Sequence, residues 1–217
     1  REHQLLSKLN SDYVVRCYEM FVHRGHLCLV FELLGMDLRA ASKLRHTKPF
    51  DLETVKEYAI QMFIGLHALR KAKLVHADIK PDNFLLSQDG KKVKFCDFGT
   101  AFPIDEVTVI EYLVARYYRA PEIILGCHID YAIDTWSVGC TLYELFTNDF
   151  LFPGRDHNEM LKLIMQTKGK FSIKMLKKGV FTEKHFDHNY NFLERHVDPK
   201  TFATTMKVSN ITIAPER

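Results

Sequence analysis

Four polar residues in one stretch of the chain have the types and spacing that phosphoryl transfer requires. Asp78 is followed by Lys80 and Asn83, so one folded loop can bring a carboxylate, an ammonium and an amide together. Asp97 comes later and can reach the same volume from the next hairpin. A carboxylate can take the proton of an attacking hydroxyl, an ammonium can neutralise the transferring group, and amide and carboxylate oxygens can hold Mg²⁺. The spacing predicts a site in which Asp78, Lys80 and Asn83 are catalytic, and Asn83 and Asp97 bind the metal.

Hydrophobic periodicity predicts the elements that position these residues. The expected elements are a helix at the start of the chain (residues 2–9), a hairpin (14–22 and 26–32), a long helix (52–69), two short strands (84–86 and 93–95) and a buried central helix (131–147). Arg24 and Gly25 form the hairpin turn signal, and Asp51 can cap the long helix. The last helix is apolar almost all round, which is typical of a helix buried on every side.

Composition fits one globular domain, or a large lobe with part of a second. The chain has 217 residues, 47% of them hydrophobic, and a net charge of +3, so nothing global indicates nucleic acid or a membrane surface. Its five cysteines show no paired spacing and are expected to be free thiols. No apolar run reaches membrane-spanning length. Because the chain opens with Arg rather than Met, we expect it to be a fragment.

The order of motifs resembles eukaryotic protein kinases. The catalytic-loop spacing from His76 to Asn83, Asp97-Phe98-Gly99, Ala120-Pro121-Glu122 and Asp134-x-Trp136-Ser137-x-Gly139 occur in kinase order. The resemblance implies an α+β kinase-like fold with a partial small lobe (1–34) and most of the mainly helical large lobe (35–217). It also implies ATP and Mg²⁺ as cofactors. Finally, it implies structural anchors at His76, Glu122 and Asp134.

The same resemblance implies an ATP-binding set around residues 27–38. Phe31 would be the gatekeeper, the backbone of Glu32 and Leu34 would bind the purine, and Asp37 would lie near the ribose. Glu2 would pair with an ATP-contacting lysine upstream of residue 1. Because that lysine and the glycine-rich loop are not in the sequence, we expect residues 1–217 alone to be inactive. Kinases with a lysine at the place of Lys80 act on Ser and Thr.

The segment from Tyr112 to Glu122, here called the activation segment, is similar to that of the CMGC kinase group. In that group a phosphate on the tyrosine is held by two arginines, here Arg116 and Arg119. Ile110 stands where MAP kinases have a threonine, which argues against dual phosphorylation. Ala77 replaces the arginine that usually precedes the catalytic Asp, so Ala77 cannot contact that phosphate.

Residues 162–178 hold six lysines and no acidic residue, most simply a solvated face and alternatively a docking surface for a partner. The sequence from Gly169 to Asp187 resembles the insert of the pre-mRNA-processing Ser/Thr kinases of the spliceosome. That resemblance implies protein substrates, among them splicing factors, and a nuclear location. Direct nucleic-acid binding is not expected, since aromatic residues are not interleaved with the lysines. Membrane binding is not expected either, since the charge is nearly balanced and no apolar run is long enough to span a membrane.

Three alternatives stay open at the level of sequence. One is a kinase of the homeodomain-interacting or tyrosine-regulated dual-specificity branches, although the insert argues against the first. Another is a pseudokinase scaffold, because the upstream lysine cannot be checked. The third is a binding module built on the basic insert.

Overall fold

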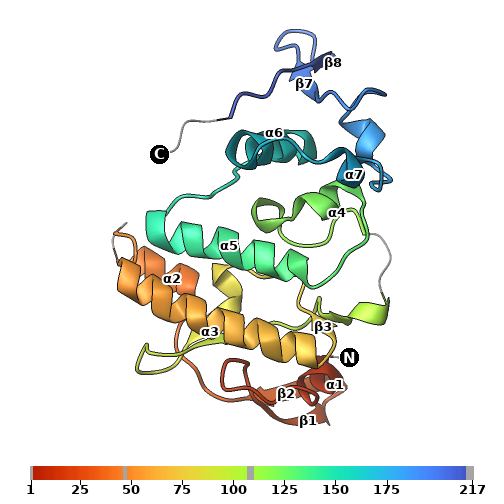
Figure 1. Ribbon diagram of the computed structural model, residues 1–217. Helices are drawn as coiled ribbons and strands as arrows, with labels where there is room; N and C mark the ends of the chain where they lie inside the picture. The colour runs from red at the N-terminus through yellow and green to blue at the C-terminus, as the bar shows by residue number, and fades with distance from the viewer. Residues whose placement is uncertain (1, 46–47, 107–109, 214–217) are drawn as a thin grey trace. The chain divides into compact units, whose positions relative to one another are not determined.

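The computed structural model describes residues 2–45, 48–106 and 110–213 (Figure 1). The chain forms two compact units: residues 1–107 with 130–151, and residues 108–129 with 152–217. This division does not coincide with the lobe boundary expected after residue 34, which stays a prediction.

The first unit mixes helices with two-stranded sheets. Its helices are α1 (Glu2–Leu6), α2 (Leu38–Leu44), α3 (Leu52–Lys71) and α5 (Ala132–Thr147), with 3₁₀ turns η1 (Pro81–Asn83) and η2 (Ile104–Glu106). Its antiparallel strand pairs are β1 (Cys17–His23) with β2 (His26–Phe31), β3 (Leu74–Val75) with β6 (Phe102–Pro103), and β4 (Phe84–Leu86) with β5 (Val93–Phe95). One hydrophobic core joins α1, α3, α5 and the strand pair β4–β5.

The predicted hairpin forms, with a shorter first strand. Arg24 and Gly25 have φ of 49° and 79°, and two adjacent left-handed residues give a turn that matches the twist of the strands. Strand β1 begins at Cys17 because Val14 forms a bridge with Phe95 instead. The opening helix is also shorter than predicted and ends at Leu6.

Helix α3 confirms its predicted cap and amphipathic face. The Asp51 carboxylate accepts a hydrogen bond from the backbone N–H of Thr54 at 2.9 Å. The buried side of α3 includes Met62 and Leu69, and it packs against α5 (Figure 1).

The prediction that α5 is buried on every side is wrong. One stripe of α5, including Thr135, Gly139 and Tyr143, is exposed, while the polar Asp134 and Glu144 are buried. Helix α5 therefore has one buried and one exposed side. The residue types do not show this division, because the buried side also carries polar groups that bind other segments.

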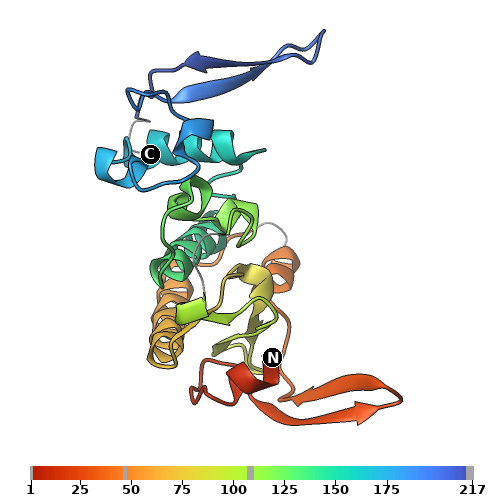
Figure 2. The ribbon, with the colours of Figure 1, turned by 90° about the vertical axis from the view of Figure 1, so that its right-hand side faces the viewer.

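The second unit is mostly helical and ends in a hairpin. It contains η3 (Arg116–Tyr118), α4 (Pro121–Leu125), α6 (His157–Lys168), α7 (Ile173–Leu176), η4 (Thr182–Lys184), β7 (Leu193–Val197) and β8 (Thr204–Val208). Strands β7 and β8 pair antiparallel and form a ribbon that the sequence did not predict (Figure 2). No helix in the described ranges is long and apolar enough to cross a membrane. All five cysteines are free thiols, as predicted.

Candidate active site

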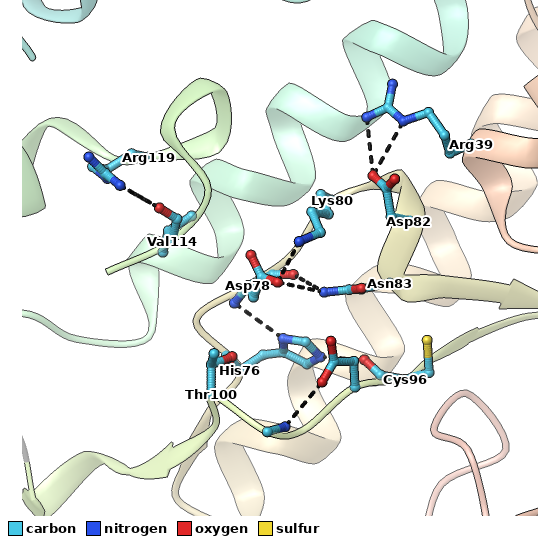
Figure 3. Close-up of polar contacts among 12 residues, drawn as sticks. Arg39, His76, Asp78, Lys80, Asp82, Asn83, Cys96, Thr100, Val114 and Arg119 are labelled. Carbon is cyan, nitrogen blue, oxygen red and sulfur yellow. Dashed lines mark hydrogen bonds and ion pairs between the residues drawn. The ribbon is translucent and has the colours of Figure 1, made fainter. Parts of the chain in front are cut away.

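The catalytic-loop residues form one hydrogen-bonded group in the first unit (Figure 3). Asp78 Oδ2 accepts from Lys80 Nζ at 2.6 Å and from Asn83 Nδ2 at 2.9 Å. Asn83 Nδ2 also donates to the carbonyl oxygen of Asp78 at 2.7 Å. The 3₁₀ turn η1, which begins with Pro81, brings these side chains onto one another. Because both side-chain contacts use Oδ2, Asp78 Oδ1 is the oxygen that can take a proton.

His76 connects the catalytic loop to the loop that carries Asp97. The backbone N–H of Asp78 donates to His76 Nδ1 at 3.3 Å, so Nε2 carries the ring proton and donates to the carbonyl of Cys96 at 3.0 Å. The hydroxyl of Thr100 donates to the carbonyl of His76 at 3.1 Å. His76 thus links the catalytic loop to the segment that precedes Asp97.

Asp97 is held close to Asn83 through the residue before it. The N–H of Cys96 donates to the carbonyl of Asn83 at 3.0 Å. Asp97 itself has φ of 60°, a left-handed conformation that costs a non-glycine residue about 1 kcal/mol or more. Burial raises the pKa of the neighbouring Cys96 thiol to about 12, so this thiol stays protonated.

Asp134 fixes the backbone before the catalytic Asp. Its carboxylate is 2% exposed and accepts the N–H groups of His76 at 2.7 Å and of Ala77 at 3.0 Å. These two bonds hold Ala77 at φ of 65°. Burial raises the pKa of the Asp134 carboxyl, while His76 and the two N–H groups act in the opposite direction.

Arg39 is a positioning residue that the sequence did not reveal. On α2, it binds Asp82 of the catalytic loop at 3.2 Å (Figure 3). It also forms an ion pair with Glu144 of α5. The partners lie 43 and 105 positions away, so no local pattern marks them.

The oxygen donors present fit Mg²⁺. Asn83 uses its amide nitrogen toward Asp78, which leaves its amide oxygen for a cation. Among the residues that the structure describes, Asp97 accepts one hydrogen bond, from the N–H of Gly99 at 3.3 Å. No group of three or more His, Cys, Asp or Glu side chains forms a metal site in the part of the chain that the structure describes. Two protein oxygens suit Mg²⁺, which keeps waters and substrate phosphates as its other ligands.

The residues expected to bind the purine adjoin the catalytic loop through β4. Gly35 donates to the carbonyl of Leu86 at 2.7 Å, and Leu86 donates to the carbonyl of Met36 at 2.9 Å. A Cβ on Gly35 would lie 3.1 Å from that Leu86 carbonyl, which explains a glycine there. Phe31 and Leu34 are partly buried and pack against the core, and their expected roles as gatekeeper and hinge residue stay predictions.

Three acidic residues of the expected ATP-binding set have defined partners. The carboxylate of Glu32 binds Lys94 Nζ at 2.7 and 2.9 Å, and its N–H donates to the carbonyl of Arg16. The side chain of Glu32 therefore faces Lys94, and its backbone carbonyl is the group left for a purine. Asp37 Oδ1 caps α2 by accepting from Ala40 at 2.7 Å. Glu2 Oε1 accepts the N–H of Phe98 at 3.2 Å, which places Glu2 beside Asp97.

In the second unit, Tyr112 and Arg119 have opposite environments. Tyr112 is 75% exposed, and its ring lies 5.8 Å from the guanidinium of Arg119. Arg119 is buried and donates to the carbonyls of Leu113 at 2.8 Å and Val114 at 2.7 Å (Figure 3). Val114 has φ of 67°, unusual for a β-branched residue, and Arg119 holds its carbonyl in that conformation. Burial lowers the pKa of Arg119.

The other predicted residues of the second unit are also placed. Arg116 Nη1 donates to the carbonyl of Arg155 at 2.6 Å. Glu122 lies in the first turn of α4, and its carbonyl accepts the N–H of Cys127 at 2.8 Å. His157, which the sequence analysis missed, contacts both Tyr112 and Arg119.

Comparison with known families agrees with this geometry. Residues 1–207 match the model of the protein kinase domain. The chain belongs to the protein kinase family. Within this family, the chain is 44% identical over 205 residues to serine/threonine-protein kinase prp4 of Schizosaccharomyces pombe, covering 94% of this chain and 43% of that protein. It is 43% identical over 208 residues to serine/threonine-protein kinase prpf4B of Dictyostelium discoideum, covering 91% and 26%.

Similarity to another branch is lower. The kinase is 37% identical over 198 residues to homeodomain-interacting protein kinase 1 of Mus musculus, covering 88% of this chain and 16% of that protein. The kinase chain thus spans less than half the length of the curated relatives that it matches.

Proposed function

We propose that the full-length protein transfers the γ-phosphate of ATP to Ser and Thr hydroxyls of proteins. The observation that carries this proposal is the contact of Lys80 and Asn83 with a single oxygen of Asp78, at 2.6 and 2.9 Å. That arrangement leaves the second oxygen of a catalytic carboxylate open beside an ammonium and an amide. It supports a positioned base next to a cation, the combination that phosphoryl transfer needs.

The reaction uses each group once. Asp78 Oδ1 accepts the hydroxyl proton as the substrate oxygen bonds to the γ-phosphorus and the bond to the ADP oxygen breaks. Lys80 neutralises negative charge on the transferring group. Asn83 and Asp97 would hold Mg²⁺, which neutralises the phosphate oxygens when bound.

The proposed substrate class and location are inferred from the similar proteins and from the sequence of residues 169–187. The two most similar relatives named above are both serine/threonine kinases. The resemblance of residues 169–187 to pre-mRNA-processing kinases supports splicing factors as substrates and a nuclear location.

Activity is tested with full-length protein, ATP and a Ser/Thr-rich substrate over a Mg²⁺ titration. We expect phosphoserine and phosphothreonine products, and a loss of at least about 100-fold in turnover for Asp97→Asn, since the variant lacks the charged metal ligand. Near-normal turnover of Asp97→Asn would show that the metal assignment is wrong. Absence of transfer by the unmodified protein, with ATP still bound, would favour a pseudokinase scaffold.

Two further proposals concern regulation and partners. A phosphate on Tyr112 would order the activation segment through Arg116 and Arg119, because the methyl group of Ala77 cannot bind it. Mass spectrometry of fully active enzyme tests this, because an unmodified Tyr112 would exclude the mechanism. The lysine-rich segment, residues 162–178, could dock a partner. Five of its six lysines are exposed, and the sixth, Lys162, pairs with Glu194.

We also propose that residues 1–217 alone turn over negligibly. The 217 residues contain no glycine-rich loop and no lysine placed to pair with Glu2. Preorganised charges supply most of the catalysis in such sites, so their absence should abolish it. Robust activity of the purified chain would contradict this proposal.

A further inference from the structure

A cavity of about 240 Å³ in the second unit is lined by α6, α7 and the segments on either side of the β7–β8 ribbon. Its buried lining is apolar and consists of Met165, Leu176, Phe186 and Phe192. Ile173, which also lines it, is 58% exposed, so the cavity opens to solvent beside α7. A protein cavity of about 150 Å³ already holds benzene, so this one has room for an aromatic or branched aliphatic side chain.

The walls of this cavity are fixed by hydrogen bonds. Phe186 and Phe192 form an antiparallel bridge, and the N–H of Ser209 donates to the carbonyl of Phe192 at 2.9 Å. The hydroxyl oxygen of Ser172 caps α7 by accepting the N–H of Met175 at 3.2 Å. A cavity whose walls are already held loses little conformational entropy when it receives a side chain.

The chain that forms one wall of the cavity is strongly basic. Residues 160–182 contain six lysines and no acidic residue, and Lys170 lines the cavity itself. None of the described residues that line the cavity is acidic. The nearby carboxylate of Asp187 accepts the N–H groups of Asn189 and Asn191 at 2.9 and 2.8 Å, so its charge is engaged within its own turn. The combination of an apolar cavity and a basic wall is complementary to an apolar side chain flanked by carboxylates.

We propose that this cavity docks an acidic segment of a partner protein and that one aromatic or aliphatic side chain of that segment inserts into it. The carboxylates of the segment face Lys170 and the exposed lysines near it in the chain, Lys168 and Lys174. The inserted side chain fixes the register of the segment, and the charges attract it. This proposal deepens the docking role proposed above for residues 162–178 and rests on it.

A nucleic acid would match the lysines but not the cavity. Bases stack on aromatic faces that lie open to solvent. Phe186 and Phe192 are buried, and their rings pack edge to face with centroids 5.4 Å apart. The aromatic rings of the cavity therefore contact one another and suit a side chain inserted between them and α7 better than a row of bases.

The test measures fluorescence anisotropy of two labelled peptides with the full-length protein. One peptide is Asp-Glu-Asp-Phe-Glu-Asp-Glu, and in the other alanine replaces the phenylalanine. We expect saturable binding of the phenylalanine peptide that weakens as salt is added and weakens about tenfold in Lys170→Glu. Lys200→Glu makes the same charge change at an exposed lysine outside the cavity and should leave binding unchanged.

Ile173→Ser tests whether the phenylalanine enters the cavity. The variant should weaken binding of the phenylalanine peptide about tenfold and leave the weaker binding of the alanine peptide unchanged, because only phenylalanine reaches Ile173. Val180→Ser, at a residue that is 67% exposed and outside the cavity, should change the binding of neither peptide.

Equal binding of the two peptides, with loss in Lys170→Glu, would overturn the insertion into the cavity while the docking role of the lysines stood. Absence of binding by either peptide would overturn both. Tighter binding of polyuridylate than of the phenylalanine peptide, lost in Lys170→Glu, would assign the lysines to nucleic acid and also overturn the proposal. Since neither ATP nor phosphate transfer enters these measurements, their failure is distinct from failure of the proposed kinase activity.

Discussion

Asp78 and Asp134 are carboxylates of the same unit with different surroundings. Both oxygens of Asp134 accept backbone N–H groups, and the residue is 2% exposed. Asp78 keeps one oxygen open, and its side chain is 16% exposed. Asp134 therefore suits a positioning role, whereas Asp78 can exchange a proton with a substrate.

Asp134→Asn tests the positioning role. An amide supplies one acceptor oxygen for two backbone N–H groups, so the N–H of His76 or Ala77 loses its partner. We expect the free energy of unfolding to fall by about 1–3 kcal/mol, with a matching loss of activity. Urea denaturation measures the change, and Asp130→Asn at an exposed position is the control. Equal stability of the two variants would contradict the role.

His185 predicts how stability depends on pH. Burial lowers the pKa of this buried histidine to about 4 from its ordinary 6.5. Below pH 6.5 the unfolded chain takes up a proton that the folded protein refuses, so stability falls as pH drops from 6.5 toward 4. The loss should approach about 3 kcal/mol.

Denaturation curves at several pH values measure this effect in the unmodified protein and in His185→Gln. The variant should lose less stability over the same pH window. Part of the loss should remain, because the pKa of His157 is also lowered. His188→Gln, at an exposed position, is the control. An unchanged slope in His185→Gln would show that His185 is not the group responsible.

At the scale of elements, close packing of α3 on β5 supports the catalytic loop. A Cβ on Gly65 of α3 would lie 2.3 Å from the ring of Phe95. The centroid of the Phe95 ring lies 5.9 Å from that of the His76 ring and 4.6 Å from that of the Phe84 ring. Displacement of Phe95 would therefore reach the residue that ties the two loops of the site together.

Gly65→Ala measures this packing. Alanine favours a helix by about 1 kcal/mol over glycine, but overpacking costs about 1–3 kcal/mol, so we expect net destabilisation. Gly139→Ala on the exposed side of α5, where a Cβ meets nothing within 4 Å, should instead stabilise. Chemical denaturation gives the free energy of unfolding of both variants. A higher value for Gly65→Ala than for the unmodified protein would show that the ring of Phe95 can move aside without loss of stability.

The part of the site that could be predicted from sequence is the part built from near neighbours. Asp78, Lys80 and Asn83 contact one another within five positions, so their spacing carries the geometry. Arg39 and His157 act on partners 43 and 38 positions away, and no local pattern marks them. Helix α5 was predicted but not its exposed stripe, because residue type alone cannot show which side other segments cover.

At the scale of the whole molecule, the predicted residues divide between the two units. The residues proposed to be catalytic and to bind the metal lie in the first unit, and Tyr112, Arg116 and Arg119 lie in the second. Each unit has its own buried apolar residues, such as Phe98 in one and Ile164 in the other. The proposed control of transfer by Tyr112 would require coupling between the units, which kinetics on the full-length protein can measure.

Phosphoryl transfer at Asp78 is tested most directly by Asp78→Asn in the full-length protein, compared with Asp82→Asn in the same loop. Asp82 is 45% exposed, and an asparagine at this position can still accept a hydrogen bond from Arg39, so the Asp82→Asn variant should keep most activity. We predict that Asp78→Asn still binds ATP with Mg²⁺ but transfers phosphate at least about 100-fold more slowly in single turnover, because it lacks the proton acceptor. Transfer by Asp78→Asn at the rate of the unmodified protein would contradict the assignment of Asp78 as the base.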